Sequence, residues 1–401
     1  MIRINRVLLT VSLFIAFACR TSFACIWNSD TLRSEAEHQA TAIAAITGRF
    51  DRFPNEYFEV RLARATADIE KNPSDFDAYD DAATASDRLG DDDSAIALMT
   101  RKKAALDKAG DGGTGTGDRD QVYRYLANLG TFHAHRWIRA GANRSNLDDL
   151  NQAQSLLSEA IKHNPNAHFG RERYQLLAVQ WLMSPPPCGG EAMKATILNA
   201  DPRIGELRLG PIPGHRLAQF ADLSDASDGF AGLVVLGSAW ESVDVFLALG
   251  AVLDDRGETA MASACQLRID ELLASGKKSL HPELSSRGTE LTSYGTTSVQ
   301  RKLGDVKEWY IAARQEADRW REARNKYVLA RLAKGDHPDS NSHFWDEWKE
   351  PSSPPTPPGA SLGLLLFNRG GEATLIALGA VAAISLIAAV VLALCRKAAV
   401  K

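Results

Sequence analysis

The sequence predicts an all-α protein, and two observations carry this prediction. Between residues 25 and 350, apolar residues recur at three- and four-residue steps, and few β-branched stretches alternate with polar residues. Two predicted helices, residues 56–71 and 151–163, also stop at the pairs Asn72-Pro73 and Asn164-Pro165. Because proline disfavours a helical conformation in the residue before it, each pair separates one helix from the next.

Composition bounds the function before any motif is considered. The chain has 401 residues, of which 45% are hydrophobic and 24% charged, enough for one large or two ordinary domains with a real core. The formal net charge of −4 excludes the global basic field of a non-specific nucleic-acid binder, so we expect no nucleic-acid partner. Five cysteines are too few for a fold built on disulfides.

A pattern of small and large apolar residues recurs along the body. The first unit, near residues 73–106, has Tyr79, Ala83, Gly90 and Ala95 at its key positions. The second unit, near 122–165, carries Leu126, Leu129-Gly130, Ala153, Leu157, Ala160 and Pro165. The third unit, near 243–275, carries Phe246, Leu249-Gly250, Leu253, Gly257 and Ala262. Two antiparallel helices approach closely only where alanine or glycine occupies the crossing, so each unit predicts a helical hairpin.

These residues resemble the tetratricopeptide repeat (TPR), a helical hairpin of about 34 residues. The resemblance implies stacked hairpins that bind other proteins on one face, and an ordinary helical bundle is the alternative. Insertions at 107–121, 136–149 and 184–190 make a regular superhelix doubtful and favour an irregular domain. Some TPR domains bind a terminal carboxylate through basic and amide residues. Only Asn128 fits that pattern, since Asp80 and Thr84 stand where Lys and Asn are expected.

The N-terminus predicts export. Residues 1–24 contain Arg3 and Arg6, an apolar run, and small residues before a cleavage point that would leave Cys25 first. An uncleaved anchor and a lipoprotein signal are the lesser alternatives.

The C-terminus predicts a membrane anchor. Residues 373–395 are uncharged, and at ~1.5 Å per residue a helix of this length crosses the ~30 Å hydrocarbon core of a bilayer. We therefore expect a transmembrane helix at 372–395, preceded by a Pro-rich stalk and juxtamembrane segment at 344–371. Arg396 and Lys397 favour a cytoplasmic tail at 396–401, which places the exported body, residues 25–343, outside the cytoplasm. The signal requires the same orientation.

One long helix closes the predicted body. Asp305 and Glu308 form a start like a capping box, and Gly335 and Pro338 mark the end. Its apolar residues fall on one stripe that we expect to pack on the body: Val306, Trp309, Tyr310, Ala313, Ala317, Trp320, Ala323 and Tyr327.

Few residues suggest chemistry. The glycine-rich stretch 112–117 lacks the Lys-Ser/Thr and the preceding strand of a phosphate-binding loop, and no metal or nucleophile motif occurs. We interpret His133 and His135 as surface or packing residues. The cluster His168, Arg171 and Arg173 is a candidate contact for an acidic peptide group or an anionic polymer. Asn128 is a further candidate partner-binding residue. Cys25 and Cys188 are the candidate disulfide, and Cys265 is expected to be a buried small hydrophobe.

The sequence thus predicts a single-pass protein of the cell envelope, with an irregular TPR-like body that binds a protein or peptide outside the cytoplasm. We expect no catalytic residues, no cofactor and no metal. A membrane-tethered enzyme whose site assembles only in three dimensions, and a module that binds cell-wall polymer, are the alternatives.

Overall fold

The computed structural model describes residues 26–31, 41–110, 120–165, 171–188, 192–200, 226–285, 297–351 and 355. The regular elements in these ranges are all helices, which confirms the all-α class. The signal at 1–24 and the span at 372–395 lie outside these ranges and stay predictions. Of the helices that the structure describes, none is both long and apolar enough to cross a bilayer.

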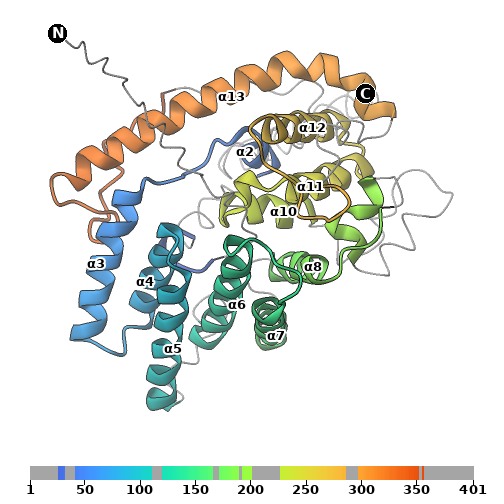
Figure 1. Cartoon of the computed structure of the whole chain (residues 1–401). Helices are drawn as coiled ribbons and strands as arrows, with labels where there is room; N and C mark the ends of the chain where they lie inside the picture. The colour runs from blue at the N-terminus through green and yellow to red at the C-terminus, as the bar shows by residue number, and fades with distance from the viewer. Residues whose placement is uncertain are drawn as a thin grey trace, which may run out of the picture.

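Apart from the first pair, helices that follow one another in the chain pack side by side (Figure 1). In order they are α2 (Ala42–Thr47), α3 (Asn55–Lys71), α4 (Phe76–Leu89), α5 (Asp92–Ala109), α6 (Gln121–Arg139), α7 (Asp148–His163), α8 (Arg171–Met183), α10 (Ala226–Val235), α11 (Val243–Asp255), α12 (Thr259–Ala274) and α13 (Thr297–Leu332). Short 3-10 turns η4 (Ala192–Ala195), η5 (Ile197–Ala200) and η7 (Ala239–Glu241) lie between them. Helices α4 and α6 also touch each other directly.

The first predicted unit forms the hairpin of α4 and α5. Asp75 caps α4 by accepting a hydrogen bond from the Ala78 amide at 3.1 Å, and Asp91 caps α5 in the same way through Ser94 at 3.0 Å. Between the helices Gly90 has φ +89°, a left-handed conformation that strains a residue with a side chain. These local signals explain why so short a turn connects the two helices.

The second and third units form the hairpins of α6 with α7 and of α11 with α12. At each crossing a glycine faces the partner helix. A Cβ on Gly130 would lie 3.1 Å from the Leu157 side chain, and one on Gly250 would lie 3.1 Å from Cys265. The Leu-Gly pairs therefore mark two crossings with the same packing. This shared geometry is repeat-like, and the TPR assignment itself remains a proposal.

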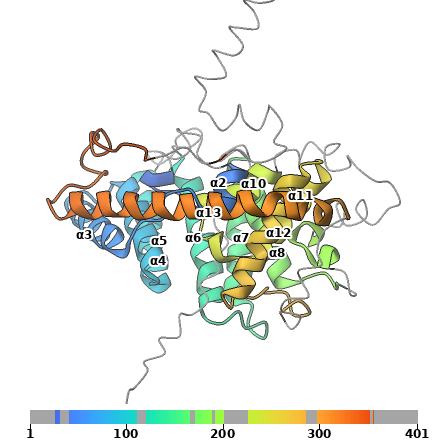
Figure 2. The same cartoon turned by 90° about the horizontal axis from the view of Figure 1, so that it is seen from above.

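Helix α13 runs across the whole body, from α12 to α3 (Figures 1 and 2). Its stripe packs on the body as predicted: Val306, Tyr310, Ala313, Ala317 and Trp320 are all buried. The predicted start is wrong, because the helix begins at Thr297 and Asp305 lies inside it. The apolar stripe predicted the part of the helix that packs on the body, and the helix itself begins earlier, at Thr297.

Gly130→Val tests the close crossing of α6 and α7. We expect it to lower the free energy of unfolding by about 1–3 kcal/mol, because the new methyl groups meet Leu157 and the Ala153 carbonyl. Denaturant unfolding measures the change, and Ala104→Val on the exposed face of α5 is the control. An equal loss in both variants would mean that Gly130 has no special packing role.

Candidate functional site

Polar side chains line the facing sides of α4 and α6. On α6, Arg124, Asn128, His135 and Arg139 are spaced by four, seven and four residues, which places them on one face of the helix. Asp77, Asp80 and Asp87 on α4 face them through the ion pairs and hydrogen bonds described below. We call these seven residues the inner seam.

One end of the inner seam is a buried ion network. The Asp80 carboxylate and the Lys102 ammonium from α5 are both fully buried and lie 2.8 Å apart. Arg124 donates to Asp80 at 2.9 Å and to Asp77 at 2.7 Å. Burial lowers the pKa of Lys102 to about 8 even though Asp80 opposes the shift. Removing Asp80 would leave the buried ammonium of Lys102 without its carboxylate partner.

The N-terminal segment of the described chain, residues 26–31, lies against this end of the inner seam. Asn128 holds the backbone of Trp27 twice: its Oδ1 accepts from the amide at 2.7 Å, and its Nδ2 donates to the carbonyl at 3.0 Å. The indole of Trp27 is fully buried, edge-on to Tyr123 with ring centroids 5.7 Å apart. The inner seam thus recognises one residue by its backbone and by a large side chain.

Further contacts fix the rest of the segment. Ser29 donates to Asp81 on α4 from its amide at 2.9 Å and from its hydroxyl at 2.7 Å. Asp30 accepts a hydrogen bond from Tyr57 at 2.6 Å and pairs with the buried Arg61 of α3. Three helices therefore hold a few consecutive residues of the chain.

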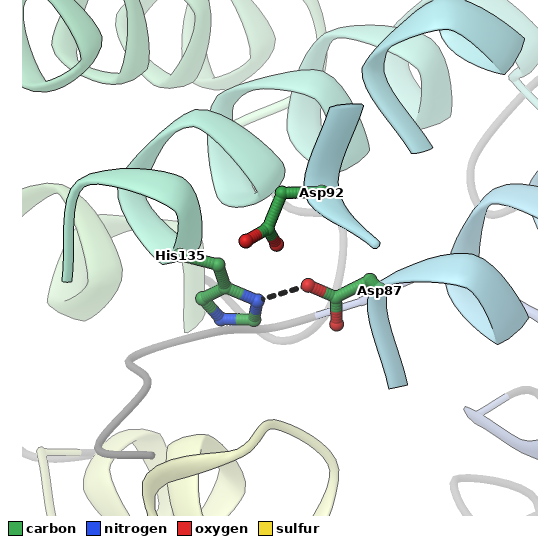
Figure 3. A group of neighbouring side chains, drawn as sticks. All are labelled: Asp87, Asp92 and His135. Carbon is green, nitrogen blue, oxygen red and sulfur yellow. Dashed lines mark hydrogen bonds and ion pairs between the residues drawn. The ribbon is translucent and has the colours of Figure 1, made fainter. Parts of the chain in front are cut away.

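The other end of the inner seam centres on His135 (Figure 3). His135 Nδ1 lies 2.6 Å from Asp87 Oδ1, and both residues are fully buried. Arg139 donates to Asp87 at 2.8 Å and also pairs with Asp92 at the start of α5. Because an ionised carboxylate only accepts hydrogen bonds, His135 donates its Nδ1–H to Asp87.

Burial and neighbouring charges shift the pKa values of the two carboxyl groups at this end in opposite directions. Burial opposes ionisation of Asp87, but His135 and Arg139 outweigh it and hold the pKa of Asp87 well below its usual range. Burial, together with the nearby Asp87 and against the charge of Arg139, raises the pKa of Asp92 to about 7. Burial also lowers the pKa of His135, which favours the neutral ring.

Asp87, Asp92 and His135 could offer ligand atoms to a metal ion, since these atoms lie within 4.8 Å of one another. However, Arg139 donates to both carboxylates from the same nitrogen. A guanidinium thus already supplies the positive charge that a metal ion would bring. We assign the group to the internal ion network of the seam.

The residues predicted to contact a partner do not form one surface. Asn128 is fully buried and its amide is used inside the fold, so a partner reaches it only by displacing the N-terminal segment. Arg171 is 7% exposed and packs where Gly232 of α10 lies, whereas Arg173 is exposed and donates to the Pro165 carbonyl at 3.4 Å. His168 lies outside the described residues. The prediction that Arg171 and Arg173 form one surface cluster is therefore wrong, because Arg171 is buried.

The cysteines are described in part. Cys188 is buried with its sulfur 2.8 Å from a Glu283 carboxylate oxygen, and Cys25 lies outside the described residues, so their pairing stays a prediction. Cys265 is a buried small residue beneath Gly250, as predicted, and burial raises the pKa of its thiol. Of the histidines weighed as packing residues, His133 is partly buried and bonded to Asp149 at 2.7 Å.

Sequence reasoning missed the inner seam and its occupant. The spacing of Arg124, Asn128, His135 and Arg139 can be read from the sequence. However, polar residues at this spacing are also typical of the solvent-exposed face of a helix. Ile26-Trp27, two large apolar residues that follow Cys25, was the available signal that this segment is buried.

Comparisons with protein-family models, with curated proteins and with solved structures find no match to this chain.

Asp92→Asn tests the charge arrangement at His135. Because the folded pKa of Asp92 is raised to about 7 from an ordinary value near 3.9, the folded chain binds its proton more tightly than the unfolded chain. Ionisation of Asp92 then costs stability as the pH rises from about 4 to about 7. We expect the free energy of unfolding of Asp92→Asn, measured by urea titration, to fall less than that of the wild type over this window.

The control is Asp93→Asn. Asp93 is the next residue in the chain, and its side chain is 83% exposed. It should follow the wild-type pH profile. A parallel loss of stability in the wild type and in Asp92→Asn would show that Asp92 ionises normally in the folded chain.

Proposed function

We propose that this chain is a non-catalytic, TPR-like scaffold that binds a peptide segment of a partner outside the cytoplasm. One observation carries the proposal: the inner seam already holds a peptide segment, residues 26–31, by the backbone of Trp27 and by its buried indole. A surface that recognises backbone groups and one large aromatic anchor has the chemistry of peptide recognition.

The contacts also define what such a peptide would present. The Asn128 amide needs one residue with an accessible N–H and C=O, and the cavity filled by Trp27 needs a large ring. Asp81 accepts from an amide and a hydroxyl, while Arg61 pairs with a carboxylate. The proposed ligand is therefore a segment with an aromatic residue followed by hydroxyl and acidic residues.

An enzyme at the seam is less well supported. Asp80, Asp87 and His135 are fully buried, and each already uses a carboxylate oxygen or ring nitrogen in an ion pair or hydrogen bond. A general acid or base must lie within hydrogen-bond reach of its substrate. An exposed row of aromatic rings would favour binding of cell-wall polymer, yet Trp309, Tyr310 and Trp320 of α13 are buried.

The location forms part of the same proposal. A basic and apolar N-terminus, the uncharged stretch at 373–395 and the basic residues after it support an exported body held by one C-terminal membrane helix. The described body has its own core and supports an independent domain between these ends.

Peptide binding in trans is tested with the full chain carrying Trp27→Ala. This change empties the indole cavity, at a cost of about 3–5 kcal/mol in stability, and weakens the internal segment. A fluorescent peptide of residues 26–34 should then bind the variant measurably more tightly than it binds the wild type, by fluorescence anisotropy. Should Trp27→Ala unfold, Trp27→Phe takes its place.

Adding Asn128→Ala to the Trp27→Ala chain should abolish this binding, whereas Asn151→Ala on the exposed face of α7 should leave it unchanged. The proposal fails if a folded Trp27→Ala chain shows no saturable peptide binding.

Orientation is tested by protease added to intact cells that express the chain with a tag after Lys401. We expect the body to be cleaved and the tag to survive, because the basic tail should remain inside. A cleaved tag beside an intact body would place the body in the cytoplasm.

A further inference from the structure

A second feature of the fold is a pocket that the inner seam does not use. Its volume is about 270 Å³, and its wall is formed by residues of the N-terminal segment, of 50–58 and of 234–241, with Arg88 from the end of α4. This is just under the usual range for small-molecule sites, about 300–1,000 Å³. It suits a small ligand or one terminal group of a longer one.

Aromatic rings supply the apolar part of the wall. Phe50, Phe53, Phe58 and Trp240 all line the pocket. Phe50 and Trp240 pack edge to face with centroids 5.6 Å apart, which fixes their orientation. A flat or apolar body in the ligand would find rings to contact.

The carboxylates of the wall are already neutralised by cations from outside it. Asp51 pairs with Arg324 at 2.8 Å, Glu241 pairs with Lys277 at 2.6 Å, and Asp30 pairs with Arg61. Beyond Asp30 lie Asp339, on the other side of Arg61, and Asp81. The negative charge near the pocket is thus concentrated at the Asp30 end.

Arg52 and Arg88 are the cations of the wall, and among the described residues neither has a carboxylate ion pair. Arg52 donates to the Gly48 carbonyl at 3.1 Å, and its Nε is buried without a hydrogen-bond partner in that part of the chain. Arg88 donates to the Leu236 carbonyl at 3.0 Å and to the Ser238 hydroxyl. Asp87 and Asp30 partly offset the charge of Arg88, and Asp318 partly offsets that of Arg52, without a direct ion pair to either guanidinium.

Arg52 is one of three arginines that lie around the Trp240 ring. The guanidinium carbons of Arg52, Arg268 and Arg314 lie 4.3, 3.6 and 5.1 Å from the centroid of the Trp240 ring. The carboxylates that serve this group are Glu271, which pairs with Arg268 and Arg314, and Asp318, which pairs with Arg314 and Arg321. Burial and the neighbouring Arg321, Arg314 and Arg268 lower the pKa of Arg52 to about 9. The Arg52 end of the pocket therefore has an excess of positive charge.

We propose that this pocket binds an oxyanion, a carboxylate or a phosphate, carried on a small aromatic or apolar body. The oxyanion contacts Arg52 and Arg88, and the body lies against Phe50, Phe53 and Trp240. A guanidinium suits both anions because its donors match two oxygens at once. The contacts to the oxyanion lie outside the inner seam, but the N-terminal segment that the seam holds forms part of the pocket wall.

The test uses the full chain and three probes of similar size: phenyl phosphate, phenylacetate and the neutral benzyl alcohol. Isothermal titration calorimetry should show saturable binding of at least one oxyanion probe and at least about tenfold weaker binding of benzyl alcohol. Stronger binding of phenyl phosphate supports a phosphate ligand, and stronger binding of phenylacetate supports a carboxylate ligand.

Arg52→Gln should weaken the preferred oxyanion probe by about tenfold or more, while Arg52→Lys, which keeps the charge, should retain part of the affinity. Arg101→Gln, on the exposed face of α5, removes the same charge elsewhere and should change nothing. Thermal melting confirms that each variant is folded. Equal binding of benzyl alcohol and the oxyanions, or unchanged affinity in folded Arg52→Gln, would overturn the proposal.

Discussion

The fold depends on matching the charges that the contacts among α4, α5 and α6 remove from water. Asp80 and Lys102 are fully buried, and the Arg124 side chain is 3% exposed, so each must keep its partner or face the cost of a lone buried ion. These partners come from α4, α5 and α6, and the ion network therefore fixes how the three helices meet. An apolar seam would tolerate sliding, whereas Asp87 and Arg139 at the far end allow one register only.

Local signals predicted the hairpins because they act within a few residues. Proline after Asn72, the left-handed Gly90 and the Leu-Gly pair at Gly130 each determine a turn or a crossing without information from distant residues. The inner seam could not be found in this way. Asp80 and Asn128 are far apart in sequence, and charged residues on a helix face are normally solvated, so their pattern alone favours an exposed surface. Tertiary packing decides between the two.

The N-terminal segment shows how the chain closes on itself. Arg61 of α3 is fully buried between Asp30, in the N-terminal segment, and Asp339, which follows α13. One guanidinium thus joins the two ends of the described body to α3. The bond to Asp339 lets the residues after α13 turn back onto α3, where Phe344 is buried beside Tyr57. The segment in the inner seam is therefore part of the structure that also closes the C-terminal side.

The inner seam and the pocket meet at the last turn of α4. Asp87 points to His135 in the seam, and Arg88, one residue further, reaches the pocket wall. Successive residues on a helix point about 100° apart, so one short stretch serves both sites. Arg88 also ties α4 to the residues after α10 through the Leu236 carbonyl. An anion bound to Arg88 would lie beside this tie, so the pocket and the contact between the first hairpin and the rest of the body share one residue.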